Sequence, residues 1–436
     1  MAKSFRQFYG WKLVAALWSL DFLNMGFPLY GGTVINVYML KQIVMPRSTY
    51  GLGFTLLNIF VGVPSVAIAA SILRWGVRKT FLIGSALIFL GSIWMALFAT
   101  KPWHYLVGFG VLIGSGIGFG TIIPLATAIS RWFRRYRGRA MAIALTASGF
   151  AGLAAAPLVN KFLAAAGGSW RLGWEIVAGI AVASAVIAFL TIKESPEQVG
   201  QEVDGGAPNE EQSKSVAPKS LVTKHKWIPA DAYRTLSFWM IFVGSVACQY
   251  PFFFFTAHWI LHLSGVGVSA ANAALAMGLF TMGSIPGGVI GGWLMDRLQA
   301  RFAFILGLFC YIFGSFLAMG TGTGNLVIAF AAAILYGAGF RWSFVCLNTI
   351  IAHFYGPEAY PKLSGTMLML SALACSPAGV VGGRLFDIYK SYNPAFILNI
   401  AVALAGVCAL CFAKMPQPRP AGDECKTMLE CGSTQA

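Results

Sequence analysis

The sequence predicts an all-α membrane protein whose twelve transmembrane helices form two pseudo-symmetric six-helix bundles. Of its 436 residues, 57% are hydrophobic and 11% are charged, and the mean hydropathy is +0.71. In soluble proteins about a quarter of the residues are charged. Apolar runs of about 20 residues, each long enough to cross a bilayer, recur along the chain. A basic loop after the second run of each half indicates that the halves repeat each other.

The twelve predicted spans begin near residues 12, 50, 80, 105, 141, 174, 236, 271, 302, 326, 364 and 394. The first run is about 28 residues long and lacks a small-residue cleavage site, so we expect it to stay in the membrane as a helix. An even number of spans places both termini on one side. We therefore expect an N-terminal bundle over 1–192, a cytoplasmic linker over 193–235, a C-terminal bundle over 236–413 and a cytoplasmic tail over 414–436.

The linker separates the two bundles by composition. Residues 193–234 are rich in charged residues, Pro, Gly and Ser. This composition predicts a solvated segment whose first part lacks fixed structure.

The net charge of +16 arises mainly from short loops between the apolar runs. Arg74, Arg78 and Lys79 follow the second span, and five arginines within residues 131–139 follow the fourth. By the positive-inside rule these loops and both termini face the cytoplasm. We therefore expect a multi-pass protein of the cell (inner) membrane, whose partner is the lipid bilayer and not nucleic acid.

The basic loops belong to an internal repeat. The segments LRWGVRKTFLIG at 73–84 and DRLQARFAFILG at 296–307 align at a constant offset, which matches Arg74 with Arg297 and Arg78 with Arg301. Asp296 is the acid of the second copy. Such repeats are typical of secondary transporters, whose substrate site lies near the midplane between two bundles. These five residues are the predicted gating set.

The spans, the linker and the duplicated loop resemble the major facilitator superfamily. Asp296, Arg297 and Arg301 match the family's loop signature, whereas Leu73 stands where the first copy usually has aspartate. Three segments resemble the bacterial monocarboxylate porter and oxalate–formate antiporter branch: FYGWKLV at 8–14, RWFRRYRGRA at 131–140 and FYGPEAYPKLSG at 354–365. The resemblance implies the major facilitator fold and transport by alternating access.

The eighth span departs from this branch. Its proton-coupled members carry an acid and an arginine there, and the spacing places Ser284 and Gly288 at those positions. The first span also lacks the lysine of the animal members. The mechanism of a lactate carrier therefore does not transfer unchanged.

One arginine lies near the middle of an apolar run. Arg341 stands within residues 326–353, where a guanidinium costs about 2.5–3.5 kcal/mol unless it faces the bundle interior or a wet cavity. Asp21, in the first span, is the one acid deep within a predicted span. The resemblance places both on cavity-lining helices. They form either a structural salt bridge or a functional pair, in which Asp21 releases Arg341 to substrate and titrates as the coupling group.

Span seven predicts an aromatic wall. Four consecutive phenylalanines at 252–255 point all round a helix, although plain core packing explains the same pattern. His258 and His262, one turn apart near the outer end, are expected to form a wet rim rather than a metal site. The candidate substrate-binding residues are Arg341, Asp21, Gln249, Tyr250, Phe254 and Asn348.

We expect a secondary active transporter of a small organic anion, a mono- or aromatic carboxylate, with a proton or counter-anion as its coupling partner. The alternative is an exporter of lipophilic or drug-like compounds, for which the aromatic wall matters more than Arg341. No catalytic constellation or P-loop is visible in the sequence, so we expect no enzyme activity and no cofactor or metal. A receptor is disfavoured because no signalling domain is attached. We expect a monomer.

Overall fold

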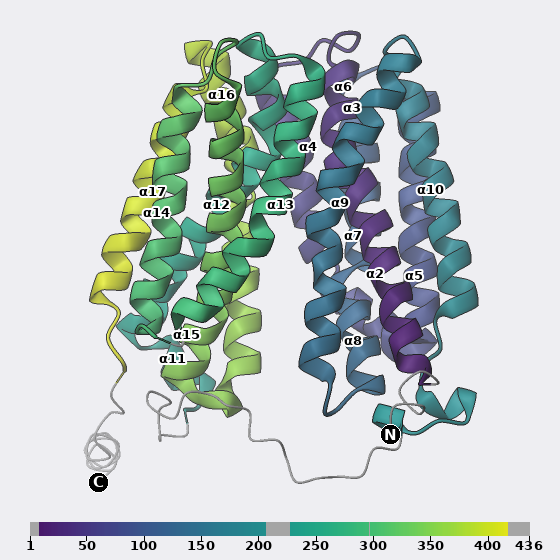
Figure 1. The fold of residues 1–436 in the computed structure, drawn as a ribbon, viewed down its shortest axis with the longest axis vertical. Coiled ribbons are helices and arrows are strands. Elements are labelled where there is room, and N and C mark those ends of the chain that lie inside the picture. Colours follow the sequence, from purple (N-terminus) through teal and green to yellow (C-terminus); the bar gives the residue numbers. More distant parts are fainter. Residues whose placement is uncertain (1–7, 206–226, 296, 417–436) are drawn as a thin grey trace, which may run out of the picture.

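The computed structural model describes residues 8–205, 227–295 and 297–416, and these fold mostly into helices (Figure 1). The helices of the N-terminal half are α2 (Tyr9–Met25), α3 (Gly32–Met39), α4 (Arg47–Gly62), α5 (Ser65–Phe98), α6 (Pro102–Tyr105), α7 (Gly114–Gly120), α8 (Ile122–Trp132), α9 (Arg137–Ala165) and α10 (Trp170–Thr191). Those of the C-terminal half are α11 (Pro229–Tyr233), α12 (Leu236–Gly265), α13 (Ala270–Met295), α14 (Ala300–Met319), α15 (Leu326–Cys375), α16 (Ala378–Tyr389) and α17 (Asn393–Phe412). Two π-helical segments, Gly26–Gly31 and Leu106–Ile113, continue α2 into α3 and α6 into α7.

Eleven segments of the described chain are long and apolar enough to cross a membrane, against the twelve spans predicted. The difference lies at the second span. There α4 covers only 16 residues and ends at Gly62, and the helix resumes as α5 at Ser65. The backbone breaks again within α5 at Gly76, whose φ of 88° favours glycine. Thus α4 and residues 65–75 together occupy the place of the second predicted span, and residues 77–98 that of the third.

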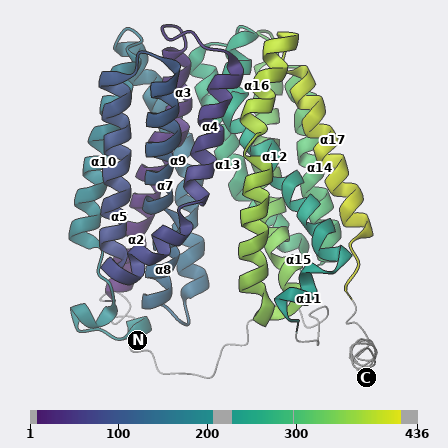
Figure 2. The ribbon, with the colours of Figure 1, turned by 180° about the vertical axis from the view of Figure 1, so that it is seen from behind.

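The two halves lie side by side, and both ends of the described chain lie at the same end of the molecule (Figures 1 and 2). We call this the terminal end and the other the opposite end. The halves diverge towards the terminal end and approach each other towards the opposite end. There α4 contacts α16, while α9 contacts α13 along the boundary between the halves.

Buried apolar side chains form two clusters. The larger one runs through the C-terminal half and continues into the N-terminal half through residues such as Phe27, Tyr50 and Phe109. The smaller one is confined to the terminal end of the N-terminal half, around Phe81 and Trp132. The halves therefore share a core away from the terminal end.

At the opposite end α4 and α16 pack backbone against backbone. Gly51 faces Gly379 so closely that a Cβ on either residue would overlap the carbonyl oxygen of the other. The Asp387 carboxylate accepts hydrogen bonds from the backbone N–H groups of Arg47 and Ser48, at 2.9 Å each. These are the first N–H groups of α4, which the helix itself cannot satisfy. A carboxylate of one half therefore caps a helix of the other.

Residues 193–205 are ordered against the N-terminal half, so the prediction that the first part of the linker lacks fixed structure is wrong for them. Glu194 accepts hydrogen bonds from the backbone N–H groups of Val77 and Arg78 and forms an ion pair of 2.8 Å with Arg131. These partners come from two basic loops that are distant in the chain, so composition alone could not indicate them. Residues 206–226 of the predicted linker and 417–436 of the predicted tail lie outside the described residues.

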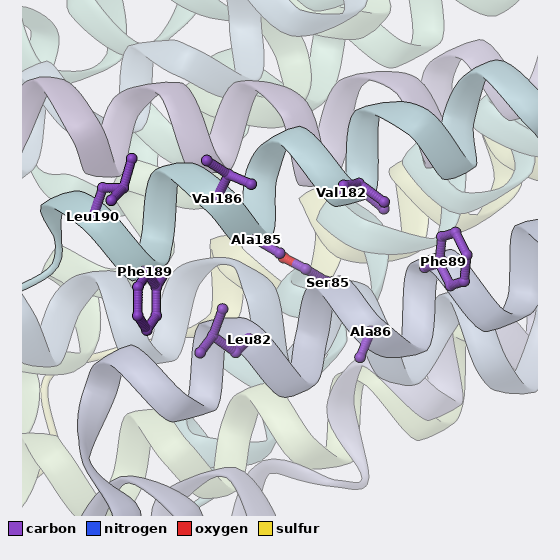
Figure 3. A pocket seen from close by; sticks show the side chains of 10 residues that line it. Leu82, Ser85, Ala86, Phe89, Val182, Ala185, Val186, Phe189 and Leu190 are labelled. Carbon is purple, nitrogen blue, oxygen red and sulfur yellow. The ribbon is translucent and has the colours of Figure 1, made fainter.

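A groove of about 380 Å³ lies between α5 and α10 on the surface of the N-terminal half (Figure 3). Leu82 and Phe89 from α5 and Phe189 from α10 line it, with Ser85 between them. None of the predicted site residues contributes to the lining. Its apolar walls suit contact with lipid chains rather than with an organic anion.

Candidate functional site

Asp21 lies on α2, whose position is fixed by two buried hydrogen bonds of Asn24. Asn24 donates from Nδ2 to the carbonyl oxygen of Gly120 at 2.9 Å and accepts at Oδ1 from the Ser184 hydroxyl at 2.8 Å. These bonds tie α2 to α7 and α10. Asp21, one turn earlier, is 2% exposed, and its carboxylate makes neither a hydrogen bond nor an ion pair with a described residue. A buried charge without a partner is unfavourable, and the structure shows none for Asp21 among the described residues.

Arg341 lies on α15 at the boundary between the halves. Its Nη2 donates to the Ser148 hydroxyl of α9 at 3.3 Å. Within its own half its aliphatic stem lies against Gly288 of α13, where an added Cβ would come within 2.7 Å of Arg341 Cγ. Gly288 therefore leaves the space that the stem of Arg341 fills. It is also the position at which the resembling branch carries an arginine.

No salt bridge joins Asp21 to Arg341. The ion pair found within 4.0 Å among the described residues is elsewhere, in the N-terminal half. The two charges nevertheless lie close enough to interact through space, together with the phenol of Tyr30. Tyr30 belongs to the first π-helical segment, a form that is frequent at functional sites. The Arg341 guanidinium is thus hydrogen-bonded to the neutral hydroxyl of Ser148. The Asp21 carboxylate has no hydrogen-bond partner among the described residues.

An aromatic stack stands next to Arg341 in α15. The ring of Phe252 stacks on that of Phe340 with 3.9 Å between centroids, and Phe344 follows at 5.7 Å from Phe340. Phe254, a predicted binding residue, is instead buried within the C-terminal half, with its ring centroid 5.4 Å from that of Phe396. Of the four consecutive phenylalanines, Phe252 is therefore the one stacked on the residue before Arg341.

The remaining predicted binding residues lie on α12 and α15. Gln249 is buried and donates to the Ser245 hydroxyl one turn away at 3.2 Å, and the neighbouring Tyr250 is 9% exposed. Asn348 lies about 10 Å beyond Arg341 along the helix, towards the terminal end. Its Oδ1 accepts from the Tyr360 hydroxyl at 3.1 Å. Asn348 is thus displaced from Arg341 along α15.

His258 and His262 are buried, so the prediction of a wet rim is wrong. His258 Nε2 donates to the Gly379 carbonyl oxygen at 2.7 Å, and its Nδ1 lies 3.1 Å from the Tyr392 hydroxyl. Burial raises the pKa of the Tyr392 phenol above its ordinary value, so this hydroxyl stays protonated and can donate to Nδ1. His262 Nε2 lies 2.7 Å from the Thr321 hydroxyl. Within the described residues no cluster of three metal-ligating side chains occurs.

The predicted gating arginines lie at the terminal end. Arg78 donates from Nε to a carbonyl oxygen just after α10 at 2.6 Å, and Arg301 donates from Nε to the side chain of the nearby glutamine at 3.1 Å. Arg74 lies over the ring of the adjacent Trp75 in α5, and Arg297 lies over the ring of Trp293 near the end of α13. Asp296 lies outside the described residues. Each arginine therefore contacts its own half.

Sequence reasoning missed two acidic residues with structural roles, Asp387 and Glu194. Asp387 caps α4, whose own N-cap residue is Pro46 and supplies no side-chain cap. Because Pro46 cannot cap α4 with its side chain, the sequence could have indicated that a residue from another segment supplies the cap. For Glu194 the indication was Leu73, which stands where the first basic loop usually has an aspartate. Glu194 supplies a carboxylate to this loop from another segment.

Comparisons with known proteins agree with this architecture. The model of the Major Facilitator Superfamily matches residues 20–376. Monocarboxylate transporter 13 of Bos taurus is 26% identical over 341 residues, covering 76% of this chain and 72% of that protein. Monocarboxylate transporter 12 of Rattus norvegicus is 26% identical over 368 residues, covering 78% and 71%. The uncharacterized MFS-type transporter YcxA of Bacillus subtilis (strain 168) is 24% identical over 380 residues, covering 84% and 85%.

Solved structures with similar folds are also transporters. A bacterial homolog to the human lysosomal transporter Spinster, in an inward-facing and unoccupied conformation, has a TM-score of 0.66 at 16% identity and covers 93% of this chain and 95% of its own. The nucleoside transporter NupG has a TM-score of 0.69 at 13% identity and covers 93% and 100%. At identities this low the likeness shows the fold alone.

Proposed function

The chain belongs to the major facilitator superfamily, and we propose that it moves a small organic anion, a mono- or aromatic carboxylate, by alternating access. It is a multi-pass membrane transporter rather than an enzyme. Relatives named as monocarboxylate transporters support a carboxylate as the substrate.

The observation that carries the proposal is a guanidinium without an acidic partner at the boundary between the halves. Arg341 donates to Ser148, and no described carboxylate lies within 4.0 Å of it. A planar guanidinium binds a carboxylate through two parallel, charge-assisted hydrogen bonds. Because a cation in a membrane helix is costly when it is unpaired, a substrate anion would supply the missing partner.

The aromatic stack supports a substrate with an apolar or planar body. Phe252 and Phe340 present stacked rings in the turn of α15 that also carries Arg341. Aromatic pairs favour offset or tilted contact with a further ring. A carboxylate held by Arg341 could therefore place an aromatic or alkyl body against these rings.

We assign proton coupling to Asp21 and gating to the basic loops. Asp21 lacks a direct partner but interacts with Arg341 through space, so its protonation would strengthen the positive field that attracts the anion. Arg74, Arg78, Arg297 and Arg301, with Asp296, would steady one access state from the terminal end, which the positive-inside rule makes cytoplasmic.

Counterflow into proteoliposomes tests the substrate class. Vesicles loaded with unlabelled benzoate or lactate should accumulate the same labelled acid, whereas the uncharged benzamide should not compete. Arg341→Lys should weaken the apparent affinity about ten- to a hundredfold, because an ammonium keeps the charge but loses the planar fork. Benzoate counterflow that Arg341→Lys leaves unchanged would contradict anion binding by Arg341.

A neutral double variant separates binding from structural pairing. If Asp21 and Arg341 merely balanced each other, Asp21→Asn combined with Arg341→Gln should still transport, since matched removal of buried ions is often tolerated. A folded but inactive double variant supports the proposal. Robust uptake by it would favour the alternative, an exporter of lipophilic compounds that relies on the stack of Phe252 and Phe340.

A further inference from the structure

A cavity of about 330 Å³ lies at the terminal end of the C-terminal half. It forms where the start of α14, the part of α15 before Gly356 and the residues after α17 come together. Arg301, His353, Phe354 and Lys414 are among the residues that line it. None of the candidate substrate-binding residues contributes, so the proposed transport function leaves this cavity unexplained.

The lining is basic and has no described carboxylate to neutralise it. Arg301 is half-buried and Lys414 is exposed, and neither takes part in the ion pair recorded among the described residues. Arg301 uses Nε for the Gln299 side chain, which leaves its two terminal nitrogens for another acceptor. The Lys414 carbonyl oxygen accepts from the Ser237 hydroxyl at 2.5 Å, which fixes the backbone that carries this lysine. Two cationic residues thus line one cavity.

Helix α14 adds a third positive feature. It is 20 residues long and begins at Ala300, which lines the cavity, and no side chain caps its first turn. The N-terminus of a helix carries a partial positive charge and free N–H groups, which favour phosphate and other anions. The start of α14 therefore adds to the positive charge of the two side chains that line the cavity.

The cavity lies where apolar segments long enough to cross a membrane begin or end, so we expect it at the depth of lipid headgroups. The membrane-spanning segments Leu326–Gly356 and Asn393–Phe412 end beside it, and Ala300–Met319 begins there. Phe354 gives it an apolar wall. Phe302 and Phe412, next to the lining residues in sequence, are 45% and 70% exposed and are placed to meet acyl chains.

We propose that this cavity binds a phosphate group, as carried by the headgroup of an anionic phospholipid. Arg301 and Lys414 contact the phosphate oxygens, the start of α14 supplies backbone N–H donors, and His353 offers a further ring nitrogen. Basic pockets between helices on the cytoplasmic side are suited to such headgroups. Free inorganic phosphate shares this chemistry, so the experiment tests the phospholipid and inorganic phosphate separately.

Native mass spectrometry of the full-length protein in detergent tests the proposal. The protein is titrated with phosphatidylglycerol, with phosphatidylcholine and with inorganic phosphate. The wild type should bind phosphatidylglycerol in preference to phosphatidylcholine. Arg301→Gln combined with Lys414→Gln should weaken phosphatidylglycerol binding about tenfold and abolish the preference, because two charge-assisted contacts are lost. Lys79→Gln with Arg137→Gln removes equal charge from exposed positions of the N-terminal half and should change nothing.

The arms have separate outcomes. If inorganic phosphate leaves bound phosphatidylglycerol in place, the ligand is the lipid; if it displaces the lipid at comparable concentration, free phosphate is a ligand of the same site. Both outcomes support a phosphate site. Equal binding of phosphatidylglycerol by wild type and by the Arg301 and Lys414 double variant would overturn it, as would a wild type that binds neither phosphatidylglycerol preferentially nor phosphate. The readout is binding, so failed transport of carboxylates has no bearing on it.

Discussion

At the scale of single residues, Arg341 fits the boundary between the halves because Gly288 has no side chain. The stem of Arg341 occupies the space that a Cβ at position 288 would need. The resembling branch carries an arginine at the position of Gly288 in the eighth span, which is α13 here. We therefore infer that Arg341 of α15 supplies the cation that this branch places on α13. Gly288 is then a positioning residue and not a residue that touches the substrate.

This interpretation predicts the effect of filling the space at position 288. Gly288→Leu should displace Arg341 and lower the apparent affinity for benzoate at least about tenfold, equivalent to roughly 1.4 kcal/mol of binding free energy. The helix itself should tolerate the change, because leucine favours helical backbone more than glycine does. Counterflow at several benzoate concentrations measures the effect.

Gly292→Leu is the matched control for Gly288→Leu. Gly292 lies one turn further along α13, and a Cβ there would meet nothing within 4 Å. Transport and thermal stability of this variant should stay close to those of the wild type. If both variants transport benzoate with wild-type affinity, the position of Arg341 does not depend on Gly288.

The sequence was enough to single out Arg341 and Asp21, but not to show which residues surround them. Each charge is exceptional within an apolar run, and this is visible in one segment alone. Ser148, which binds Arg341, is separated from it by 193 residues, and packing of four distant helices decides which small side chain faces which large one. The sequence left open whether Asp21 and Arg341 form a structural salt bridge or a functional pair; no salt bridge joins them in this structure, because opposite charges on facing helices need not come within hydrogen-bond distance.

At the scale of helices, α4 and α16 form the seam that closes the opposite end. Asp387 accepts from two backbone N–H groups of α4, and the Thr55 hydroxyl of α4 donates to the Ser376 carbonyl oxygen at 2.6 Å. His258 of α12 donates to the carbonyl oxygen of Gly379, at the start of α16, and so ties α12 to the same region. Opening of this end for alternating access requires the bonds from α4 to α16 and to the turn before α16 to break.

We therefore predict that Asp387 sets how often the opposite end opens. Asp387→Ala removes two charge-assisted hydrogen bonds at a half-exposed position and should raise the population of the separated state roughly tenfold. Double electron–electron resonance measures this between spin labels at the exposed positions Val44 and Tyr389. Serine replaces the exposed Cys408 and Cys411, and the two cysteines of residues 417–436, in this background.

Asp204→Ala is the control for Asp387→Ala. The Asp204 carboxylate also accepts from two consecutive backbone N–H groups, those of Arg134 and Arg135, at 3.0 and 2.9 Å. Both partners lie in the same half as Asp204, so the distance between the two labels should not change. A distance distribution that Asp387→Ala leaves as in the wild type would show that the cap does not hold the seam.

Hydrophobic periodicity and length were enough to place most helices, but not the interruptions within them. The predicted second span is divided because Pro64 follows α4 and offers no backbone donor to continue it. The burial of His258 and His262 was missed because their acceptors, such as the Gly379 carbonyl oxygen, come from other helices. Ordering of residues 193–205 likewise depends on Glu194 reaching basic loops elsewhere in the N-terminal half.

At the scale of the whole molecule, the two halves are joined away from the terminal end and diverge towards it (Figure 1). In the described chain the hydrogen bonds between the halves run from α4 to α16 and to the turn before it, and from Arg341 to Ser148. Such an arrangement is that of one access state. The bond from Arg341 to Ser148 is the one nearest the terminal end. Which compartment that state faces depends on the orientation in the membrane.

Charge in the loops predicts this orientation. Within the N-terminal half, the terminal end carries Arg74, Arg78, Lys79, Arg131, Arg134, Arg135, Arg137 and Arg139, whereas the opposite end carries Lys41, Arg47, Lys101 and Arg171. In the C-terminal half, Lys390 adds one cation at the opposite end. Because short basic loops are retained in the cytoplasm, the terminal end should face inwards. A fluorescent protein inserted within residues 206–226 should then fluoresce, and a phosphatase active only outside the cytoplasm should work when inserted at Thr323, in the exposed turn between α14 and α15. The reverse pattern would place the terminal end outside the cytoplasm and contradict this orientation.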